Sequence, residues 1–320
     1  MKLKIVGLQS GPYRTGDSYA NRIEQLSAHF DLALQNVPDA DLIIFPELMT
    51  TPYFCKVYDK KFFEFAEPLD GKTFQFFSKK AKDSGVYIII TIFEKCVQNH
   101  KISYFNTAIL ISDSGKMIGF YRKTHIPKIS LKTLTTDESF YFERGTQFPV
   151  FDIKGIKVGI LICFDRSFPE ASRALALQGA EAIVIPTAAG GEERKNVWLL
   201  ECQARARENG LYVVGVNKAG EEVLEDNGRE IKSSFFGLSC AFDPSGKEVK
   251  NHLDSKPWQF LQLEIDHQKV EKYRSKLNHL NFLQVDLYYA YSQELQKIRN
   301  YNLEKETVPL FEPKGVVAID

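Results

Sequence analysis

One segment sets the architecture of the chain: VGILICFDRSFPEASRALALQGAEAIVIP, residues 158–186. It opens with an apolar run over 158–164, continues after Phe168 and Pro169 with helical periodicity, and closes with a second apolar run over 181–186. Short runs rich in β-branched residues are typical of buried strands, whereas an amphipathic segment is typical of a helix. The segment therefore predicts a strand, a helix and a second strand in succession.

Apolar runs of the same kind lie on both sides of this unit. They are KIVGL (4–8), DLIIF (41–45), VYIIITIF (86–93), YVVGV (212–216) and FLQLEI (260–265). Helical periodicity fills several intervals, at 18–37, 73–85 and 196–210. Turn residues between other runs, such as Asp113-Ser114-Gly115, indicate hairpins. Strands buried on both faces combined with antiparallel pairs predict an α/β fold with mixed sheets and helices outside.

We expect a single domain over residues 1–285, because no internal repeat, low-complexity segment or Gly/Ser-rich linker interrupts it. The polar tail over 286–320 lacks clear periodicity. It predicts a C-terminal arm that packs on the domain or on a neighbouring subunit.

Composition excludes several classes of protein. Lys and Arg number 41 and Asp and Glu also 41, so no basic field favours nucleic acid. No apolar stretch is long enough to cross a bilayer, and the N-terminus lacks the features of a signal peptide. The five cysteines are scattered without CxxC spacing, which argues against a disulfide framework or a zinc site. We expect a cytoplasmic protein without nucleic-acid or membrane partners.

Three reactive side chains follow apolar runs. Glu47 lies in DLIIFPELMT, Lys123 in GFYRKTHIP, and Cys163 close to the end of the run over 158–164. Active sites in α/β folds favour such carboxyl ends of strands. A thiol attacks only as thiolate, so it needs a base and a positive group. Glu47 is the candidate base, while Lys123 and the backbone N–H of Phe164 are candidates to hold an oxyanion.

Each of these residues also has an ordinary interpretation. A Cys that closes an apolar strand is usually an inert core residue. A Glu after Pro is usually a helix cap or a solvated loop residue, and a Lys in a basic run usually lies on the surface. Spacing alone leaves both interpretations open.

The wording of the three segments favours the catalytic interpretation. FPEL around Glu47, YRKTHIP around Lys123 and CFDRSFPEASRALALQGA from Cys163 resemble, in order and separation, the signatures of the nitrilase, or carbon–nitrogen hydrolase, superfamily. The resemblance implies a four-layer α-β-β-α sandwich that pairs into an eight-layer dimer, so we expect a homodimer or a higher homo-oligomer. It also implies a Glu47–Lys123–Cys163 triad and no metal or organic cofactor.

Members of this family often carry a second glutamate between the Lys and Cys signatures. Here ESFYF supplies Glu138. The resemblance implies that Glu138 positions Lys123 or shares in proton transfer. The alternative is a solvated loop acid.

The motifs resemble those of enzymes with different substrates. CFDRSFPE resembles N-carbamoyl amino acid hydrolases, in which an Arg at the position of Arg166 grips the substrate carboxylate, as a guanidinium fork does well. The alternative is a structural ion pair of Arg166 with Glu170 or Asp165. Other segments, such as PYFCKVYDKKFFEFAEP, resemble N-carbamoylputrescine amidases, whose substrate tail is cationic. Thr136 departs from the D-carbamoylase pattern, which has His there.

By the same match we expect four further residues in the substrate pocket: Tyr53, Phe54, His125 and Asn217. The sequence thus predicts a cysteine-dependent amidohydrolase that cleaves the ureido C–N bond of a small N-carbamoyl compound, foremost an N-carbamoyl amino acid. The products are ammonia, carbon dioxide and the free amine. An N-carbamoylputrescine amidase, a small aliphatic or ω-amide amidase, and a catalytically idle scaffold remain alternatives.

Overall fold

The computed structural model describes residues 1–297 apart from 15, 131–134, 227, 278, 289, 291 and 295. Residues 1–278 form one compact unit, and residues 279–320 form a second unit that begins with the 3₁₀ helix η4 (His279–Phe282). Of the predicted arm over 286–320, residues 298–320 lie outside the described part. The division at residue 285 and the packing of the arm therefore stay predictions.

The first sheet contains six strands in the order β16-β1-β2-β3-β4-β5. Their bounds are β1 (Lys2–Gln9), β2 (Leu42–Ile44), β3 (Tyr87–Gln98), β4 (Lys101–Ile111), β5 (Met117–Arg122) and β16 (Gln259–Asp266). β1, β2 and β3 are parallel, while β16, β4 and β5 join antiparallel. The apolar runs predicted as strands over 4–8, 41–45, 86–93 and 260–265 supply four of these strands.

The second sheet repeats this plan in the order β15-β14-β11-β10-β9-β8. Its strands are β8 (Val150–Ile153), β9 (Ile156–Ile160), β10 (Ala182–Thr187), β11 (Tyr212–Asn217), β14 (Cys240–Phe242) and β15 (Glu248–Lys250). β9, β10 and β11 form the parallel centre. They are buried on both faces, as parallel strands with helices outside must be.

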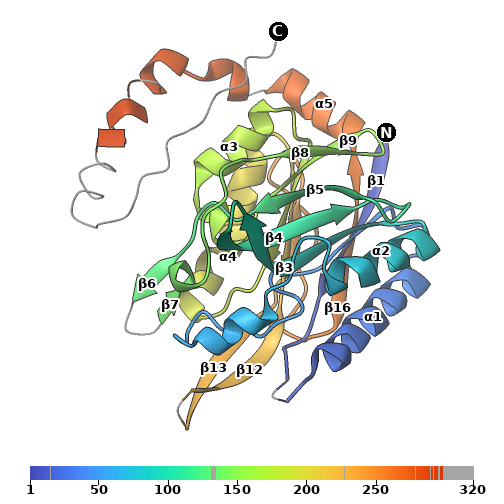
Figure 1. Ribbon diagram of the computed structural model, residues 1–320. Helices are drawn as coiled ribbons and strands as arrows, with labels where there is room; N and C mark the ends of the chain where they lie inside the picture. Colours follow the sequence, from blue (N-terminus) through green and yellow to red (C-terminus); the bar gives the residue numbers. More distant parts are fainter. Residues whose placement is uncertain are drawn as a thin grey trace. The chain divides into compact units, whose positions relative to one another are not determined.

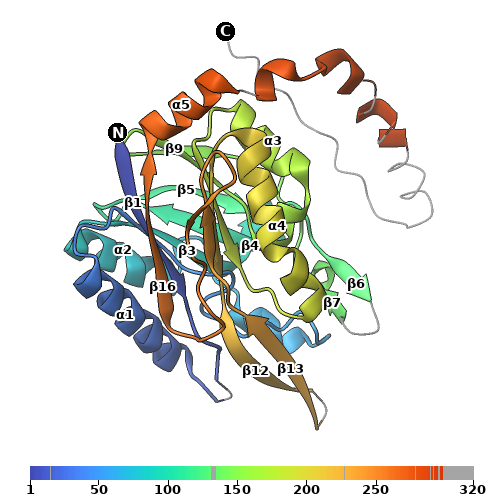
Figure 2. The same cartoon turned by 180° about the vertical axis from the view of Figure 1, so that it is seen from behind.

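Helices cover the outer face of each sheet (Figures 1 and 2). The four are α1 (Tyr19–Asn36), α2 (Lys72–Ser84), α3 (Pro169–Leu177) and α4 (Glu192–Asn209). α1 and α2 bury Phe30 and Phe77 in a cluster with first-sheet residues such as Ile43. Each strand turns successive side chains to opposite faces. On β11, Gly215 faces the helices, because a Cβ on it would meet Trp198 of α4 at 2.6 Å. The next residue, Val216, therefore faces the other sheet.

The two sheets pack directly against each other. A Cβ on Gly7 of β1 would lie 2.7 Å from Cγ2 of Val216 on β11, so glycine permits the close approach there. The order from outside to outside is helices, sheet, sheet, helices. This confirms the predicted four-layer α-β-β-α sandwich, while its pairing into eight layers stays a prediction.

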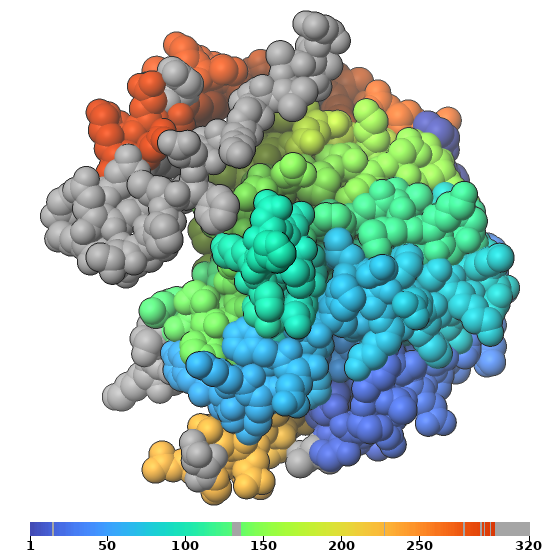
Figure 3. Space-filling view, viewed as in Figure 1, coloured from blue at the N-terminus to red at the C-terminus, as the bar shows by residue number. Residues whose placement is uncertain are grey.

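Smaller elements decorate the sandwich. They are the hairpins β6 (Lys128–Ser130) with β7 (Thr135–Asp137) and β12 (Ala219–Asp226) with β13 (Arg229–Phe236), the 3₁₀ helices η1 (Lys60–Phe65), η2 (Glu138–Phe140) and η3 (Cys163–Ser167), and α5 (His267–Lys276). The β12–β13 hairpin, which the sequence analysis did not predict, projects from the body (gold in Figures 1 and 3). Across the described residues, none of the helices has the length and apolar character needed to traverse a bilayer.

Candidate active site

Loops after β2 and β5 bring two of the predicted residues together. Glu47 lies three residues beyond the end of β2, and Lys123 follows β5 directly. Lys123 Nζ donates to Glu47 Oε1 at 2.8 Å, and both side chains are completely buried. Lys123 therefore does not lie on the surface, where a lysine usually lies.

Glu138, at the start of η2, joins this pair. Lys123 Nζ lies 2.9 Å from its Oε1 and 2.7 Å from its Oε2, and Glu138 is 1 % exposed. The alternative of a solvated loop acid does not agree with this burial. Tyr53 reaches the same carboxylate from the loop after β2, because its hydroxyl donates to Glu138 Oε1 at 2.9 Å. Lys123 thus sits between two carboxylates.

The charges around Lys123 decide its protonation. Burial lowers the pKa of Lys123, but the negative charges of Glu138 and Glu47 outweigh burial and hold that pKa well above its usual value. Burial in turn raises the pKa of Glu138, although Lys123 opposes this. The ammonium group of Lys123 is therefore a permanent positive charge at neutral pH.

Cys163 occupies a sharp turn three residues beyond β9, at the start of η3. Its φ is +48°, in the left-handed region, and Leu48 beside Glu47 has a φ of +47°. Such a conformation costs a residue other than glycine about 1–3 kcal/mol, and residues of this kind cluster at functional sites. Burial, and then the charge of Glu47, raises the pKa of Cys163 to about 11. The thiol is therefore protonated at neutral pH and requires a base before it can attack.

The carboxylate of Glu47 is fixed by partners that the sequence analysis missed. Asn106 Nδ2 of β4 donates to Oε1 at 2.7 Å, and the backbone N–H of Ala188 donates to Oε2 at 2.9 Å. Asn106 and Thr107 are the polar residues of the run YFNTAILI (104–111), and an Asn in such a run is a detectable signal. The contact of Ala188 depends on the packing of the two sheets and leaves no such signal.

Asp165 links the Lys123 loop to the Cys163 turn. Its Oδ1 accepts from the backbone N–H of His125 at 2.9 Å, and its Oδ2 accepts from the hydroxyl of Tyr121 at 2.7 Å and from Ile162 N–H at 2.9 Å. Since these donors flank Lys123 and Cys163, Asp165 fixes the two reactive groups relative to each other. The sequence analysis considered Asp165 only as a partner for Arg166.

A cavity of about 210 Å³ opens beside Cys163. Its lining comprises Pro127, Ile129, Glu138, Cys163, Phe164, Arg166, Ser167, Glu193, Arg194 and Val197. Phe164 and Arg166 thus lie where the sequence predicted pocket residues. The lining contains none of the other four predicted pocket residues, which support the site from behind it.

Each of those four residues has a defined place. Tyr53 binds Glu138, and Phe54 stacks on Phe62 at 5.3 Å in an aromatic core. His125 stacks on Phe168 at 3.8 Å, and its Nδ1 lies 2.8 Å from Asp165. Asn217 Oδ1 accepts from the backbone N–H of Ala189 at 2.8 Å, one residue beyond the Ala188 that binds Glu47.

Arg166 is held by the protein itself. Its Nε lies 2.9 Å from Glu201 Oε2, its Nη1 donates to the backbone carbonyl of Cys163 at 2.8 Å, and its guanidinium lies over the ring of Trp198. The side chain is only 2 % exposed overall. The ion pair considered as an alternative thus exists, but its partner is Glu201 of α4 rather than Glu170 or Asp165.

Arg194, in the first turn of α4, is a cavity residue that the sequence analysis missed. Within the described part of the chain, its guanidinium has no hydrogen bond or ion pair at contact distance. Burial lowers the pKa of Arg194, but the acidic groups of Tyr53, Cys163 and Glu138 together outweigh burial and raise it above its usual value. Its segment, GGEERKN, has the pattern of an ordinary charged helix start and does not indicate that Arg194 lines a cavity.

Comparison with known proteins agrees with this geometry. The chain belongs to the carbon–nitrogen hydrolase family, whose model matches residues 5–275. It is 33 % identical over 257 residues to N-carbamoylputrescine amidase of Arabidopsis thaliana, covering 78 % of this chain and 83 % of that protein. It is 31 % identical over 241 residues to citrullinase of Francisella tularensis subsp. tularensis, covering 73 % and 79 %.

Among solved structures, a carbon–nitrogen hydrolase from Helicobacter pylori G27 superimposes with a TM-score of 0.81 at 29 % identity, covering 90 % of this chain and 98 % of that one. The predicted family is thereby confirmed. The protein is an enzyme, a hydrolase of carbon–nitrogen bonds other than peptide bonds. An idle scaffold is the alternative that this finding disfavours.

Proposed function

We propose that the enzyme cleaves the ureido C–N bond of a small N-carbamoyl compound, with Cys163 as the nucleophile. The observation that carries the proposal is the buried ammonium of Lys123, which is held by Glu47 and by Glu138, the carboxylate that lines the same cavity as Cys163. A fixed positive charge next to a thiol suits a reaction in which negative charge develops on a carbonyl oxygen.

The first half of the reaction forms an S-acyl enzyme. Glu47 takes the thiol proton of Cys163, and the sulfur attacks the carbonyl carbon of the ureido group. Lys123 and the backbone N–H of Phe164 hold the resulting oxyanion. The C–N bond to one nitrogen then breaks, and this nitrogen leaves as an amine after it takes the proton from Glu47. General acid–base steps of this kind contribute a factor of about 10²–10⁴.

The second half releases the acyl group. Glu47 takes a proton from water, the oxygen attacks the S-acyl carbon, and the C–S bond breaks to return the thiol of Cys163. The carbamic acid formed decomposes to carbon dioxide and the second amine. One ureido group and one water thus give the free amine, ammonia and carbon dioxide.

The names of the relatives favour a ureido substrate over a plain amide. N-carbamoylputrescine and citrulline both end in a ureido group, although their tails differ in charge. What these two names share is therefore the reacting group. The cavity volume of about 210 Å³ also suits a small substrate, because it lies below the ~300–1,000 Å³ that is typical of drug-sized ligands.

Parallel assays of ammonia and carbon dioxide test this proposal. Purified enzyme is incubated with ureido compounds and with ω-amides of matched length. We expect equimolar ammonia and carbon dioxide from the ureido compounds. Ammonia without carbon dioxide, released faster from the amides, would replace the proposal by a small-amide amidase.

We also propose that the enzyme acts in the cytoplasm as a homo-oligomer. Its five cysteines are all free and four of them are buried, as suits a reducing compartment. The oligomer rests on the family resemblance. Sedimentation analysis at assay concentration tests it, with a mass near twice 36.5 kDa or above as the expected result and a monomer as the contrary one.

A further inference from the structure

Two arginines line the cavity, and they differ in what their guanidinium groups contact. Arg166 is committed to Glu201 and to the backbone carbonyl of Cys163. Arg194 has no such hydrogen-bonded or ion-pair partner among the described residues, although it is only half-buried and lies at the wall of the cavity. A cation that faces a cavity and has no protein group in hydrogen-bond or ion-pair contact can bind an anionic group of a ligand.

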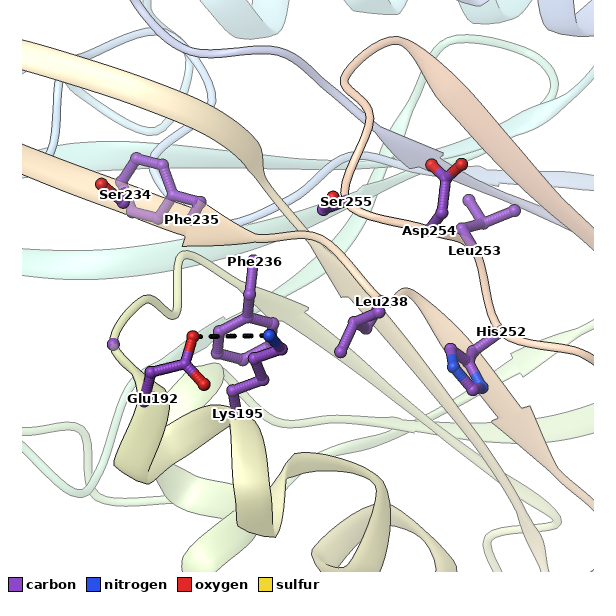
Figure 4. A pocket seen from close by; sticks show the side chains of 11 residues that line it. Glu192, Lys195, Ser234, Phe235, Phe236, Leu238, His252, Leu253, Asp254 and Ser255 are labelled. Atoms are coloured by element: carbon purple, nitrogen blue, oxygen red, sulfur yellow. Dashed lines mark hydrogen bonds and ion pairs between the residues drawn. The ribbon is translucent and has the colours of Figure 1, made fainter.

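The neighbouring residues show that this freedom is particular to Arg194. Lys195 lies one position further along α4 but pairs with Glu192 at 3.4 Å and faces a different, larger cavity of about 650 Å³ (Figure 4). Glu193 shares the lining with Arg194, but its side chain is exposed and already engaged in an interaction.

The position of Arg194 in the helix is also unfavourable for local stability. The first turn of a helix carries a partial positive charge that favours acidic residues, as Glu192 and Glu193 illustrate. An arginine there gains nothing from the helix dipole. A role toward a ligand gives a reason for its presence that local structure does not.

We infer that Arg194 binds a carboxylate on the tail of the substrate, so that the enzyme acts on ureido acids. This inference rests on the proposed ureido hydrolysis and adds the class of substrate. Cys163 and Arg194 line one small cavity, so a short molecule that bears a ureido group and a carboxylate can reach both. A guanidinium fork binds a planar carboxylate through two parallel hydrogen bonds and repels an ammonium tail.

Three ureido compounds that differ in the charge of the tail test the inference: 3-ureidopropionate, neutral propylurea and cationic 4-ureidobutylamine. In Arg194→Gln we expect kcat/KM for 3-ureidopropionate to fall about 10- to 100-fold, since a hydrogen bond between charged groups is lost. For propylurea we expect a change below about threefold. Arg194→Lys is expected to recover part of the loss, because it restores the charge but not the fork.

Lys195→Gln is the matched control, since it removes the adjacent positive charge outside the Cys163 cavity and is expected to leave all three values unchanged. Thermal unfolding of every variant checks folding. Titration of 3-ureidopropionate into Cys163→Ala protein, with and without Arg194→Gln, measures binding apart from turnover. We expect the second substitution to weaken binding by the same 10- to 100-fold.

The outcomes separate the inference from the proposed function. An equal loss for all three compounds in Arg194→Gln, or a preference of the unmodified enzyme for 4-ureidobutylamine, overturns the inference and leaves ureido hydrolysis standing. Failure of the enzyme to release carbon dioxide from any of the three overturns the proposed function. Unaltered binding of 3-ureidopropionate in the titration overturns the inference whatever the turnover.

Discussion

Among the described residues, two lysines are completely buried in charged clusters, and the clusters differ in composition. The Lys123 cluster contains Glu47 and Glu138, two carboxylates for one ammonium. The Lys218 cluster contains Glu222, 3.2 Å from Lys218 Nζ, and the buried guanidinium of Arg22, two cations for one carboxylate. The molecule thus offers an internal comparison between two sites of similar burial.

The balance of charge gives the two lysines opposite properties. In the first cluster the carboxylates raise the pKa of Lys123 against the effect of burial. In the second, burial lowers the pKa of Lys218, Glu222 offsets this only in part, and Arg22 lowers it further. An excess of carboxylate leaves a group that can accept the proton of Cys163. An excess of cation leaves no such acceptor.

The contacts of the Lys218 cluster indicate what it does instead. Glu222 accepts from the backbone N–H groups of Tyr53 and Tyr13, at 2.8 and 2.9 Å, and Lys218 donates to the carbonyl of Thr51 at 3.1 Å. The cluster therefore holds the loop that carries Tyr53 toward Glu138. The comparison teaches that a buried ion pair alone does not mark an active site; a nucleophile and a cavity beside it do.

Glu47→Gln has the largest expected effect on turnover among the cluster residues. Loss of the base is expected to lower kcat about 10²–10⁴-fold. Because the charge of Glu47 raises the pKa of Cys163, its removal lowers that pKa, so alkylation of the thiol by iodoacetamide shifts to lower pH. A variant that loses turnover while its thiol stays equally unreactive at every pH would contradict the role of Glu47.

Glu138→Gln is expected to have the next largest effect. Its loss leaves Lys123 with one carboxylate, as Lys218 has, and lowers the pKa of Lys123. We expect kcat to fall about 10- to 100-fold, and the alkaline limb of the kcat profile to move to lower pH as the ammonium deprotonates earlier. Glu143→Gln, which removes a surface carboxylate near in sequence, is the control. An alkaline limb that stays in place would show that Glu138 does not act through Lys123.

Tyr53→Phe tests the link between the clusters. It deletes one hydrogen bond to Glu138 and leaves the ring in its packing against Phe235. A single hydrogen bond to a charged group at the low end of the usual range corresponds to roughly a tenfold effect on kcat. Tyr58→Phe, which removes the hydroxyl of an exposed tyrosine, is the control. Equal kcat values for the two variants would show that the hydroxyl of Tyr53 does not contribute to turnover.

Glu222→Gln is expected to have the smallest effect on turnover and the largest on stability. It leaves the ammonium of Lys218 buried without the carboxylate of Glu222, and we expect this to lower the free energy of unfolding by about 3–5 kcal/mol. Because the amide oxygen still accepts from the Tyr53 N–H, kcat of the folded enzyme is expected to change less than about threefold. Urea unfolding and active-site titration measure the two quantities, with the exposed Glu221→Gln as control. A large loss of kcat at unchanged stability would show that the Lys218 cluster serves catalysis rather than the fold.

Much of the fold followed from periodicity. The apolar runs became the parallel strands of both sheets and the edge strand β16. The segments 18–37, 73–85 and 196–210 became α1, α2 and α4, although α4 begins four residues earlier than its pattern. The early start matters, because it places Arg194 within the helix at the cavity. The β12–β13 hairpin was missed, since its charged strands lack a clear apolar alternation.

The candidate site was predictable in part. Motif wording identified Glu47, Lys123 and Cys163, whose roles the variants above will test, but it could not give the partners that tertiary packing supplies. Glu201 reaches Arg166 from a different helix, and Ala188 reaches Glu47 from the other sheet. Arg194 could not be recognised because its distinguishing property is the lack of an ion-pair contact within the described part of the chain, which only the packed structure reveals.

The most direct test of the central claim is the rate of ammonia release from 3-ureidopropionate and propylurea by Cys163→Ala. The account predicts a fall of at least about 10⁴-fold for both compounds, with unchanged thermal unfolding, because the attacking atom is gone. Cys202→Ala, which removes another buried thiol outside the cavity, controls for general effects of losing a cysteine. A folded Cys163→Ala protein that retained the rate of the unmodified enzyme would contradict the account.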